Sequence, residues 1–322
     1  MHLYKPALVM SPIDSNTQQH WLQLIQAGQQ TKAVQIPSGQ VARLAPLNGI
    51  RAVVFDVYGT LFSSGVGDIS LATEANRDGA LRDTLRDNQI ELTATAIGLR
   101  IDQILHSIVA HHQDERRIQQ IEYPEVEIRK VWQDLLLALH QRKLITRQFT
   151  GHISTLVIDY ERRVNPTQAM PQLAAVLARL KTSGQVMSII SNAQFYTPLL
   201  FESYLNSTIQ QLGFCPDCNV WSYQELEGKP STQLYLRAAK KLKSQHNIAP
   251  HEVLYVGNDV RNDIWPAQKI GFKTALFAGD QLSLRRRSDD PNCCQVRADI
   301  EITELQQLLR CISLAPETEQ SS

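Results

Sequence analysis

Apolar residues follow two different rhythms along this chain. Residues 51–57, "RAVVFDV", are apolar on both faces and rich in β-branched side chains, which is typical of a parallel strand covered by helices. After residue 165, strand-like runs alternate with helical periods and short links, which predicts a parallel sheet with helices on both faces. The further expected strands are 185–191, 219–223, 252–257 and 273–279. The expected helices are 171–184, 197–213, 231–246, 263–271 and 300–312.

A long helical block separates the first strand from the others. Residues 68–163 repeat their apolar side chains every three or four positions, and no long strand-like run interrupts them. Tyr123-Pro124 is a plausible helix start, because proline fits the first turn. We therefore predict an α/β core made of residues 49–67 and 164–312, with an all-helical domain inserted at 68–163.

The two ends of the chain carry weaker patterns. Residues 1–48 are polar and glutamine-rich, and we expect an extension with a short helix around residues 18–28. Residues 313–322 have the composition of a disordered tail.

The charge balance argues against two classes of partner. The 322 residues include 32 basic and 32 acidic side chains, so no net charge attracts nucleic acid or an anionic membrane surface. No stretch approaches the ~20 apolar residues that cross a bilayer, and the first residues lack the pattern of a secretory signal. Five cysteines do not suit a disulfide framework, which favours a cytoplasmic location.

The cysteines offer one further pattern. Cys215 and Cys218 in "CPDC" have the spacing of a redox pair or of half a zinc site. A second pair at suitable spacing is missing, since Cys293 and Cys294 are adjacent. We interpret the first pair as ordinary loop cysteines.

Polar side chains follow four of the expected strands. Taken singly, each fits a turn or a helix cap. Because ligands of open parallel sheets bind at the carboxyl ends of the strands, we expect the four clusters to converge on one crevice. In chain order they are Asp56, then Ser191 and Asn192, then Lys229, then Asp259 and Asp263.

These residue types suit a small anionic substrate held together with a metal ion. Asp56 can attack phosphorus or carbon and form a covalent ester. Lys229 and Ser191 can neutralise and hydrogen-bond the group being transferred. Asp259 or Asp263 can join Asp56 in offering the hard oxygen ligands that Mg²⁺ prefers.

The chain resembles the haloacid dehalogenase-like (HAD) hydrolases. "FDVYGTLF", "IISNAQ", "EGKPS" and "YVGNDVRNDIWPA" look like the four motifs of that family, in the family's order and spacing. The resemblance covers about residues 50–64 and 166–280, and the helical insertion lies where the family places a type-1 cap. It implies a Rossmann-like core, an aspartyl-enzyme intermediate on Asp56, and a mobile cap that closes over the substrate.

The first motif departs from the phosphatase pattern. Phosphatases of the family usually carry a general acid/base aspartate two residues after the nucleophile, and this chain has Tyr58 there. A phenol with a pKa near 10 is a poor proton donor to a phosphoester leaving group. The D-x-Y-G-T pattern resembles that of the carbon–halogen-cleaving subgroup, which needs no metal and releases a halide without a proton. Tyr58 therefore favours a dehalogenase or another non-phosphatase role.

The fourth motif points the other way. Asp259 and Asp263 are spaced as in the metal-binding relatives, but Asn258 follows Gly257 where an aspartate is commonest. Either Asn258 takes that role with Asp263, or the loop carries one extra residue and Asp259 takes it. Two acids beside Asp56 would repel one another without a cation, which favours a Mg²⁺ site.

We therefore expect a HAD-like hydrolase acting on a small phosphorylated metabolite, with Mg²⁺ as its cofactor. The alternatives are a metal-independent 2-haloacid dehalogenase and a catalytically weak member that binds a ligand. The expected catalytic residues are Asp56 and Lys229, and the expected metal ligands are Asp56, Asp259 and Asp263, with Asn258 as a substitute. The expected substrate-binding residues are Tyr58, Thr60, Ser191 and Asn192.

Overall fold

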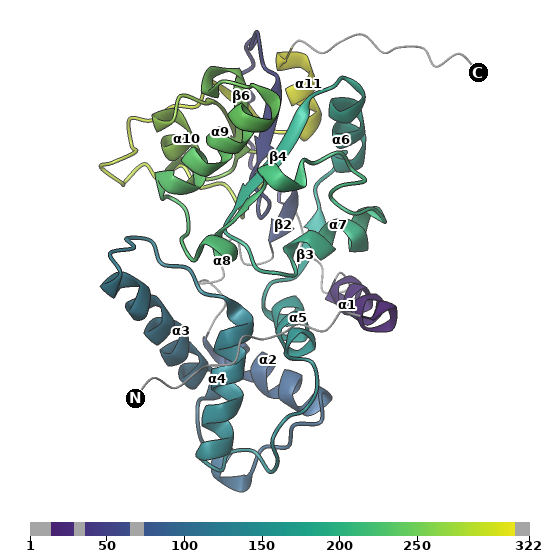
Figure 1. Ribbon diagram of the computed structural model, residues 1–322, viewed down its shortest axis with the longest axis vertical. Coiled ribbons are helices and arrows are strands. Elements are labelled where there is room, and N and C mark those ends of the chain that lie inside the picture. The colour runs from purple at the N-terminus through teal and green to yellow at the C-terminus, as the bar shows by residue number, and fades with distance from the viewer. Residues whose placement is uncertain (1–13, 29–35, 65–73, 313–322) are drawn as a thin grey trace, which may run out of the picture.

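The structure is a computed structural model that describes residues 14–28, 36–64 and 74–312. Figure 1 shows two lobes, an α/β lobe above and a lobe of helices below. In the described part of the chain, no helix combines the length and the apolar character that a membrane span requires. The tail expected at 313–322 lies outside the described residues.

The α/β lobe is built on one six-stranded sheet in the order β5-β4-β1-β6-β7-β8, and every neighbouring pair is parallel. This confirms the predicted fold class. In chain order the strands are β1 (Ala52–Phe55), β4 (Val186–Ser191), β5 (Val220–Trp221), β6 (Val253–Gly257), β7 (Lys273–Phe277) and β8 (Ile300–Ile302).

Alternate residues of the central strand β1 enter two separate hydrophobic cores. Val53 and Phe55 pack with α6 and α11, whereas Ala52 and Val54 pack with α9 and α10. Both faces of the sheet are therefore buried, which explains why the strand is apolar at every position. The helices of this lobe are α6 (Leu173–Thr182), α7 (Thr197–Leu205), α8 (Ser222–Glu225), α9 (Thr232–His246), α10 (Trp265–Lys269) and α11 (Leu308–Cys311).

Two of the predicted helices are wrong in part. The helix expected over 300–312 begins instead as strand β8, in which Ile300 and Ile302 are buried and β7 supplies the pairing edge. Only residues 305–311 are helical there. The helix expected over 197–213 ends at Leu205, because Asn206 adopts a left-handed conformation with φ 51°.

The second lobe is the predicted cap. Its helices pack around Trp132 and Leu135, both fully buried. A short antiparallel ladder between β2 (Phe62–Ser64) and β3 (Thr167–Ala169) lies where the chain leaves the core and returns to it. The cap helices are α2 (Glu74–Asp87), α3 (Ile101–Ile118), α4 (Ile128–Gln141) and α5 (Ile153–Val164).

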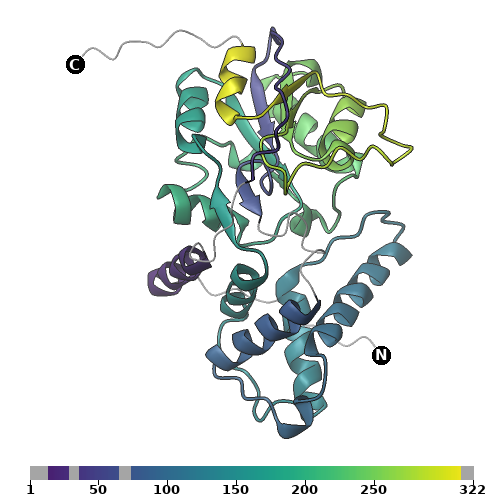
Figure 2. The ribbon, with the colours of Figure 1, turned by 180° about the vertical axis from the view of Figure 1, so that it is seen from behind.

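Helix α1 (Ser15–Gly28) packs across the junction of the two lobes. It lies beside α5 of the cap and contacts α7 of the core, as Figures 1 and 2 show from opposite sides. The indole of Trp21 is buried, donates to Thr155 Oγ1 at 2.8 Å, and meets the ring of Phe195 edge-on. On the core side, Gln18 donates to Glu202 at 2.8 Å. Part of the N-terminal extension therefore belongs to the folded body.

We predict that Trp21→Ala lowers the free energy of unfolding by about 3 kcal/mol, because it empties a buried aromatic site and leaves Thr155 without its donor. Denaturant unfolding followed by circular dichroism measures the change. Gln23→Ala, on the exposed side of the same helix, is the matched control. Equal stability of Trp21→Ala and the wild type would show that α1 does not support the fold.

Candidate active site

The ammonium group of Lys229 lies between two carboxylates. Its Nζ donates to Asp56 Oδ1 at 2.7 Å and to Asp263 Oδ1 at 2.6 Å. The three residues are 8%, 5% and 1% exposed. Burial alone would disfavour the ammonium, but the two carboxylates outweigh it and raise the pKa of Lys229. Burial, together with the charges of Asp56 and Asp259, raises the pKa of Asp263 despite the nearby ammonium.

The sheet fixes the orientation of Asp56. Its backbone N–H donates to the Val256 carbonyl at 2.9 Å, so the residue is held at the end of β1. Ser191, the last residue of β4, donates to Oδ1 at 2.9 Å, beside the bond from Lys229. Both donors therefore hold the same oxygen, and within the described residues none reaches Oδ2. Oδ2 is therefore the carboxylate oxygen of Asp56 that these two donors leave open.

Asn192 supports the loop that carries Lys229. Its side-chain Oδ1 accepts the backbone N–H of Lys229 at 2.7 Å. A Cβ at Gly228 would lie 3.2 Å from the same oxygen, so glycine allows this close approach. The residue that we expected to contact substrate thus holds the backbone of Lys229.

Thr60 and Asn258 join the first and fourth motifs. Thr60 Oγ1 donates to Asn258 Oδ1 at 3.1 Å, and Asn258 Nδ2 donates to the Ser283 carbonyl at 2.6 Å. Gly59 has φ +81°, and a Cβ there would lie 2.6 Å from the Asn258 amide nitrogen. Glycine is therefore required where the loop passes this side chain. Thr60, which we expected to position the substrate, donates to the fourth motif.

Asp259 turns away from Asn258 and pairs with Arg287. Arg287 Nη2 lies 2.6 Å from Asp259 Oδ2. The next residues, Val260–Ile264, form a single turn of π-helix (η5), in which the Ile264 N–H reaches back to the Asp259 carbonyl at 3.3 Å. A π-turn accommodates one extra residue. The π-turn is compatible with the alternative in which the loop carries one extra residue, and it presents Asp263 to Lys229.

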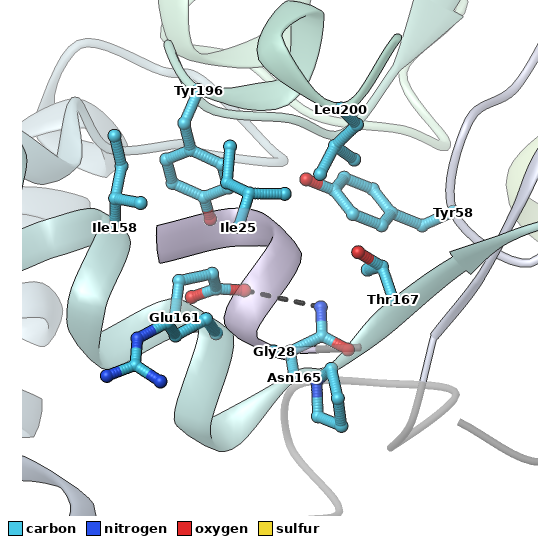
Figure 3. Close-up of a pocket in the computed structure, with 11 residues that line it drawn as sticks. Ile25, Gly28, Tyr58, Ile158, Glu161, Asn165, Thr167, Tyr196 and Leu200 are labelled. Carbon is cyan, nitrogen blue, oxygen red and sulfur yellow. Dashed lines mark hydrogen bonds between the residues drawn. The ribbon is translucent and has the colours of Figure 1, made fainter. Parts of the chain in front are cut away.

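The Tyr58 side chain lies at the junction of cap and core (Figure 3). Its hydroxyl lies 3.0 Å from Thr197 Oγ1 at the start of α7. It lines a cavity of about 20 Å³ with Glu161 and Tyr196, which Figure 3 shows. Burial, and then the charge of Glu161, raises the pKa of the Tyr58 phenol further above its usual value. The raised pKa makes the phenol a still weaker proton donor, and its hydroxyl is already engaged with Thr197.

A larger cavity of about 350 Å³ lies between the cap helices and the loop after Ser191. Gln194 and Tyr196 contribute its core side, and Glu161 faces both this cavity and the smaller one. Burial raises the pKa of Glu161 to about 6, although Asn165 and Tyr196 donate hydrogen bonds to it. The lining of the larger cavity also includes Arg77, His106, Glu125, Trp132 and Tyr160.

Sequence reasoning missed these cavity residues. They come from four cap helices, the loop between α3 and α4, and a core loop, and their spacing in the sequence matches no motif. A polar side chain on the inner face of a predicted cap helix was the one available signal, and Glu161 in α5 carries it.

The acidic residues form a poor set of Mg²⁺ ligands in this arrangement. Asp56 and Asp263 share the Lys229 ammonium, and Asp259 is paired with Arg287. Among the described residues, Asp56, Asp259 and Asp263 do not form a cluster with ligand oxygens within 4.8 Å of one another. Mg²⁺ requires near-octahedral oxygen ligands, so these ion pairs would have to open to admit it.

The family comparison agrees with the four motifs. The model of the haloacid dehalogenase-like hydrolases matches residues 50–271. The chain belongs to this family. It is therefore an enzyme of the hydrolase class. No curated protein sequence matches the chain.

Solved structures similar to this HAD-like hydrolase have low sequence identity to it. A 2-haloacid dehalogenase from Pseudomonas syringae pv. Tomato DC3000 has a TM-score of 0.51 and 17% identity, covering 81% of this chain and 97% of its own. A HAD phosphatase from Thermococcus onnurineus has a TM-score of 0.47 and 15% identity, with coverage of 81% and 97%. An L-2-haloacid dehalogenase from Xanthobacter autotrophicus has 0.43 and 19%, also with 81% and 97%.

We predict that Lys229→Met lowers the free energy of unfolding of this hydrolase by about 3–5 kcal/mol, because it leaves two buried carboxylates without their cation. Adding Asp263→Asn should recover part of the loss. Urea unfolding of the two variants measures both effects. Lys243→Met, at an exposed lysine of α9, is the control. A double variant no more stable than Lys229→Met alone would contradict the claim that Asp56 and Asp263 share the Lys229 ammonium.

We predict that Glu161→Gln flattens the dependence of stability on pH. The folded-state pKa is raised from 4.5 to about 6, so the wild type loses stability as pH rises through this window. The loss amounts to about 2 kcal/mol, and it cannot occur in the variant because glutamine does not ionise. Unfolding free energies at several pH values between 4 and 8, compared with those of the exposed control Glu91→Gln, provide the measurement. Parallel curves of unfolding free energy against pH for the wild type and Glu161→Gln would contradict the claim that burial raises the pKa of Glu161.

Proposed function

We propose that the enzyme displaces a leaving group from a small anionic organic substrate by direct attack of Asp56, without a metal ion. The leaving group departs without a proton, as the halide of a 2-haloacid does. The observation that carries this proposal is the orientation of Tyr58. In a phosphatase of the family, an acid/base aspartate would occupy position 58. Here the position holds a tyrosine, whose hydroxyl lies 3.0 Å from Thr197 Oγ1. Halide displacement requires no acid at that position.

The first step uses groups that are already oriented. Asp56 Oδ2 attacks the carbon next to the substrate carboxylate, a C–O ester bond forms, and the halide leaves with the electrons of the C–X bond. Ser191 and Lys229 hold Oδ1 and so fix the direction of Oδ2. The ammonium also offers positive charge to an anionic substrate in a site from which water is largely excluded.

The second step releases the product. Water attacks Cγ of the Asp56 ester, the bond between Cγ and the ester oxygen breaks, and that oxygen takes one proton of the water as the hydroxy acid leaves. The other proton of the water needs an acceptor. Asp263 supports this role, because its carboxylate shares the Lys229 ammonium with Asp56 and its pKa is raised.

The sequence favoured a Mg²⁺-dependent phosphatase, and the side-chain contacts change that preference. Asn258 is engaged with Thr60 and Ser283, and Asp259 with Arg287. Both candidates for the additional metal ligand therefore already serve the scaffold. The cation that neutralises Asp56 and Asp263 is Lys229 of the chain itself. These contacts support a metal-independent reaction.

We predict that the full-length protein releases halide from short 2-halo acids in the presence of excess chelator. Asp56→Asn should lower this rate on the order of 10³-fold or more. Asp289→Asn, at an exposed carboxylate, is the matched control and should keep the wild-type rate. Ion chromatography measures the halide. An aryl phosphatase activity that requires Mg²⁺ and Asp56, with no halide release, would establish the phosphatase alternative. Neither activity in a folded protein would favour the ligand-binding alternative.

Isotope labelling tests the ester itself. In a single turnover in ¹⁸O-water, the label should enter the Asp56 carboxylate, because water attacks Cγ of the ester. Peptide mass spectrometry locates it. Label appearing in the hydroxy acid during the first turnover would show that water attacks the substrate directly, and would overturn the nucleophilic role of Asp56.

A further inference from the structure

Two thiols and an imidazole meet on the far side of the core. Cys215 precedes the short helical turn η3 (Pro216–Cys218), Cys218 ends it, and His246 is the last residue of α9. Their Sγ and ring-nitrogen atoms all lie within 4.8 Å of one another, the one such cluster found among the described residues. Both cysteines are free thiols. His246, which lies 28 residues after Cys218, thus provides the further ligand that the sequence pattern lacked.

The distances approach those of a tetrahedral zinc site. His246 Nε2 lies 3.5 Å from Cys215 Sγ, and Gln245 Oε1 lies 3.5 and 3.4 Å from the two sulfurs. Zn–S bonds of about 2.3 Å and a Zn–N bond of about 2.0 Å give S···N edges of about 3.5 Å and S···S edges of about 3.8 Å. The sulfurs are 2.9 Å apart, so they need to separate by roughly 1 Å.

The surrounding backbone holds both thiols in place. The Cys215 N–H donates to the Met187 carbonyl at 2.8 Å, and the Cys218 carbonyl accepts from Ser188 Oγ at 2.8 Å. Both anchors lie in β4. The Lys241 ammonium of α9 reaches the Asn219 carbonyl at 2.9 Å, beside the cysteine turn. The turn and the end of α9 therefore already pack against each other.

We propose that Cys215, Cys218 and His246 bind a Zn²⁺ ion, with the Gln245 amide oxygen at the fourth corner. Three side chains that commonly bind Zn²⁺ converge there, and thiolate and imidazole select it over Mg²⁺. A redox pair would use only the two sulfurs, and Cys218 is completely buried, whereas redox-active cysteines are usually accessible.

The ion serves the scaffold rather than the reaction. Helix α9 has 15 residues, so about 22 Å separates its end at His246 from its start beside Lys229. The site joins the end of α9 to the turn before β5, the two-residue edge strand of the sheet. Zn²⁺ binding would fasten that edge to the helix whose other end follows the catalytic lysine.

Cobalt titration of the reduced full-length protein tests the site. With excess Mg²⁺ present to compete at the carboxylates, we expect about one Co²⁺ per chain, a sulfur-to-cobalt charge-transfer band, and the visible bands of tetrahedral Co²⁺. Zn²⁺ should abolish these bands. Cys215→Ser and His246→Ala should lose them, and Cys294→Ser, a cysteine outside the cluster, should keep them.

Thermal unfolding provides a second readout. Zn²⁺ should raise the Tm of the wild type and of Cys294→Ser, but not that of Cys215→Ser. This comparison within each variant does not require the variants to be equally stable. The proposal is overturned if reduced wild type gives no charge-transfer band, or if Cys294→Ser loses the band as Cys215→Ser does. A Cys215–Cys218 pair that forms a disulfide and does not bind Co²⁺ after it has been reduced would also overturn the proposal.

Discussion

The arrangement of the active site depends on one shared cation. Lys229 donates to Asp56 and Asp263 at 2.7 and 2.6 Å in a place with almost no solvent access. Any one of the three charges would be costly to bury alone, so each requires the others. The end of β1, the loop before α9 and the π-turn η5 must therefore meet with little freedom. Asn192 holds the backbone of Lys229 and Ser191 holds the carboxylate of Asp56, which completes the constraint.

This constraint limits the chemistry. Groups that could have served as acid, base or metal ligand are used to hold the loops together: Asn258 bonds Thr60, Asp259 bonds Arg287, and Tyr58 contacts Thr197. These contacts leave open one carboxylate oxygen of Asp56, with a buried cation behind the other. This arrangement supports our proposal that the leaving group departs as a stable anion.

The parts outside the core act through the same scaffold. Helix α1 contacts both lobes through Trp21 and Gln18, and Glu161 of the cap lies between the two cavities near Tyr58. The cap is therefore coupled to the first motif by side chains as well as by the chain connection. At the other end of α9, the Cys215 cluster lies where it can stiffen the sheet edge. Helix α9 links that edge to the loop carrying Lys229.

The sequence by itself determined the strand–helix alternation, the inserted cap and the polar residue at each strand end. These features are local, because periodicity and strand-end positions depend on neighbouring residues. It misassigned residues 300–302, where a short strand is stabilised only by pairing with β7. The tertiary structure alone decided which distant side chains meet. Asp259 accepts a hydrogen bond from Arg287, 28 residues away, and Cys215 contacts His246, 31 residues away. Such partners are selected by packing between distant segments, which no local pattern records.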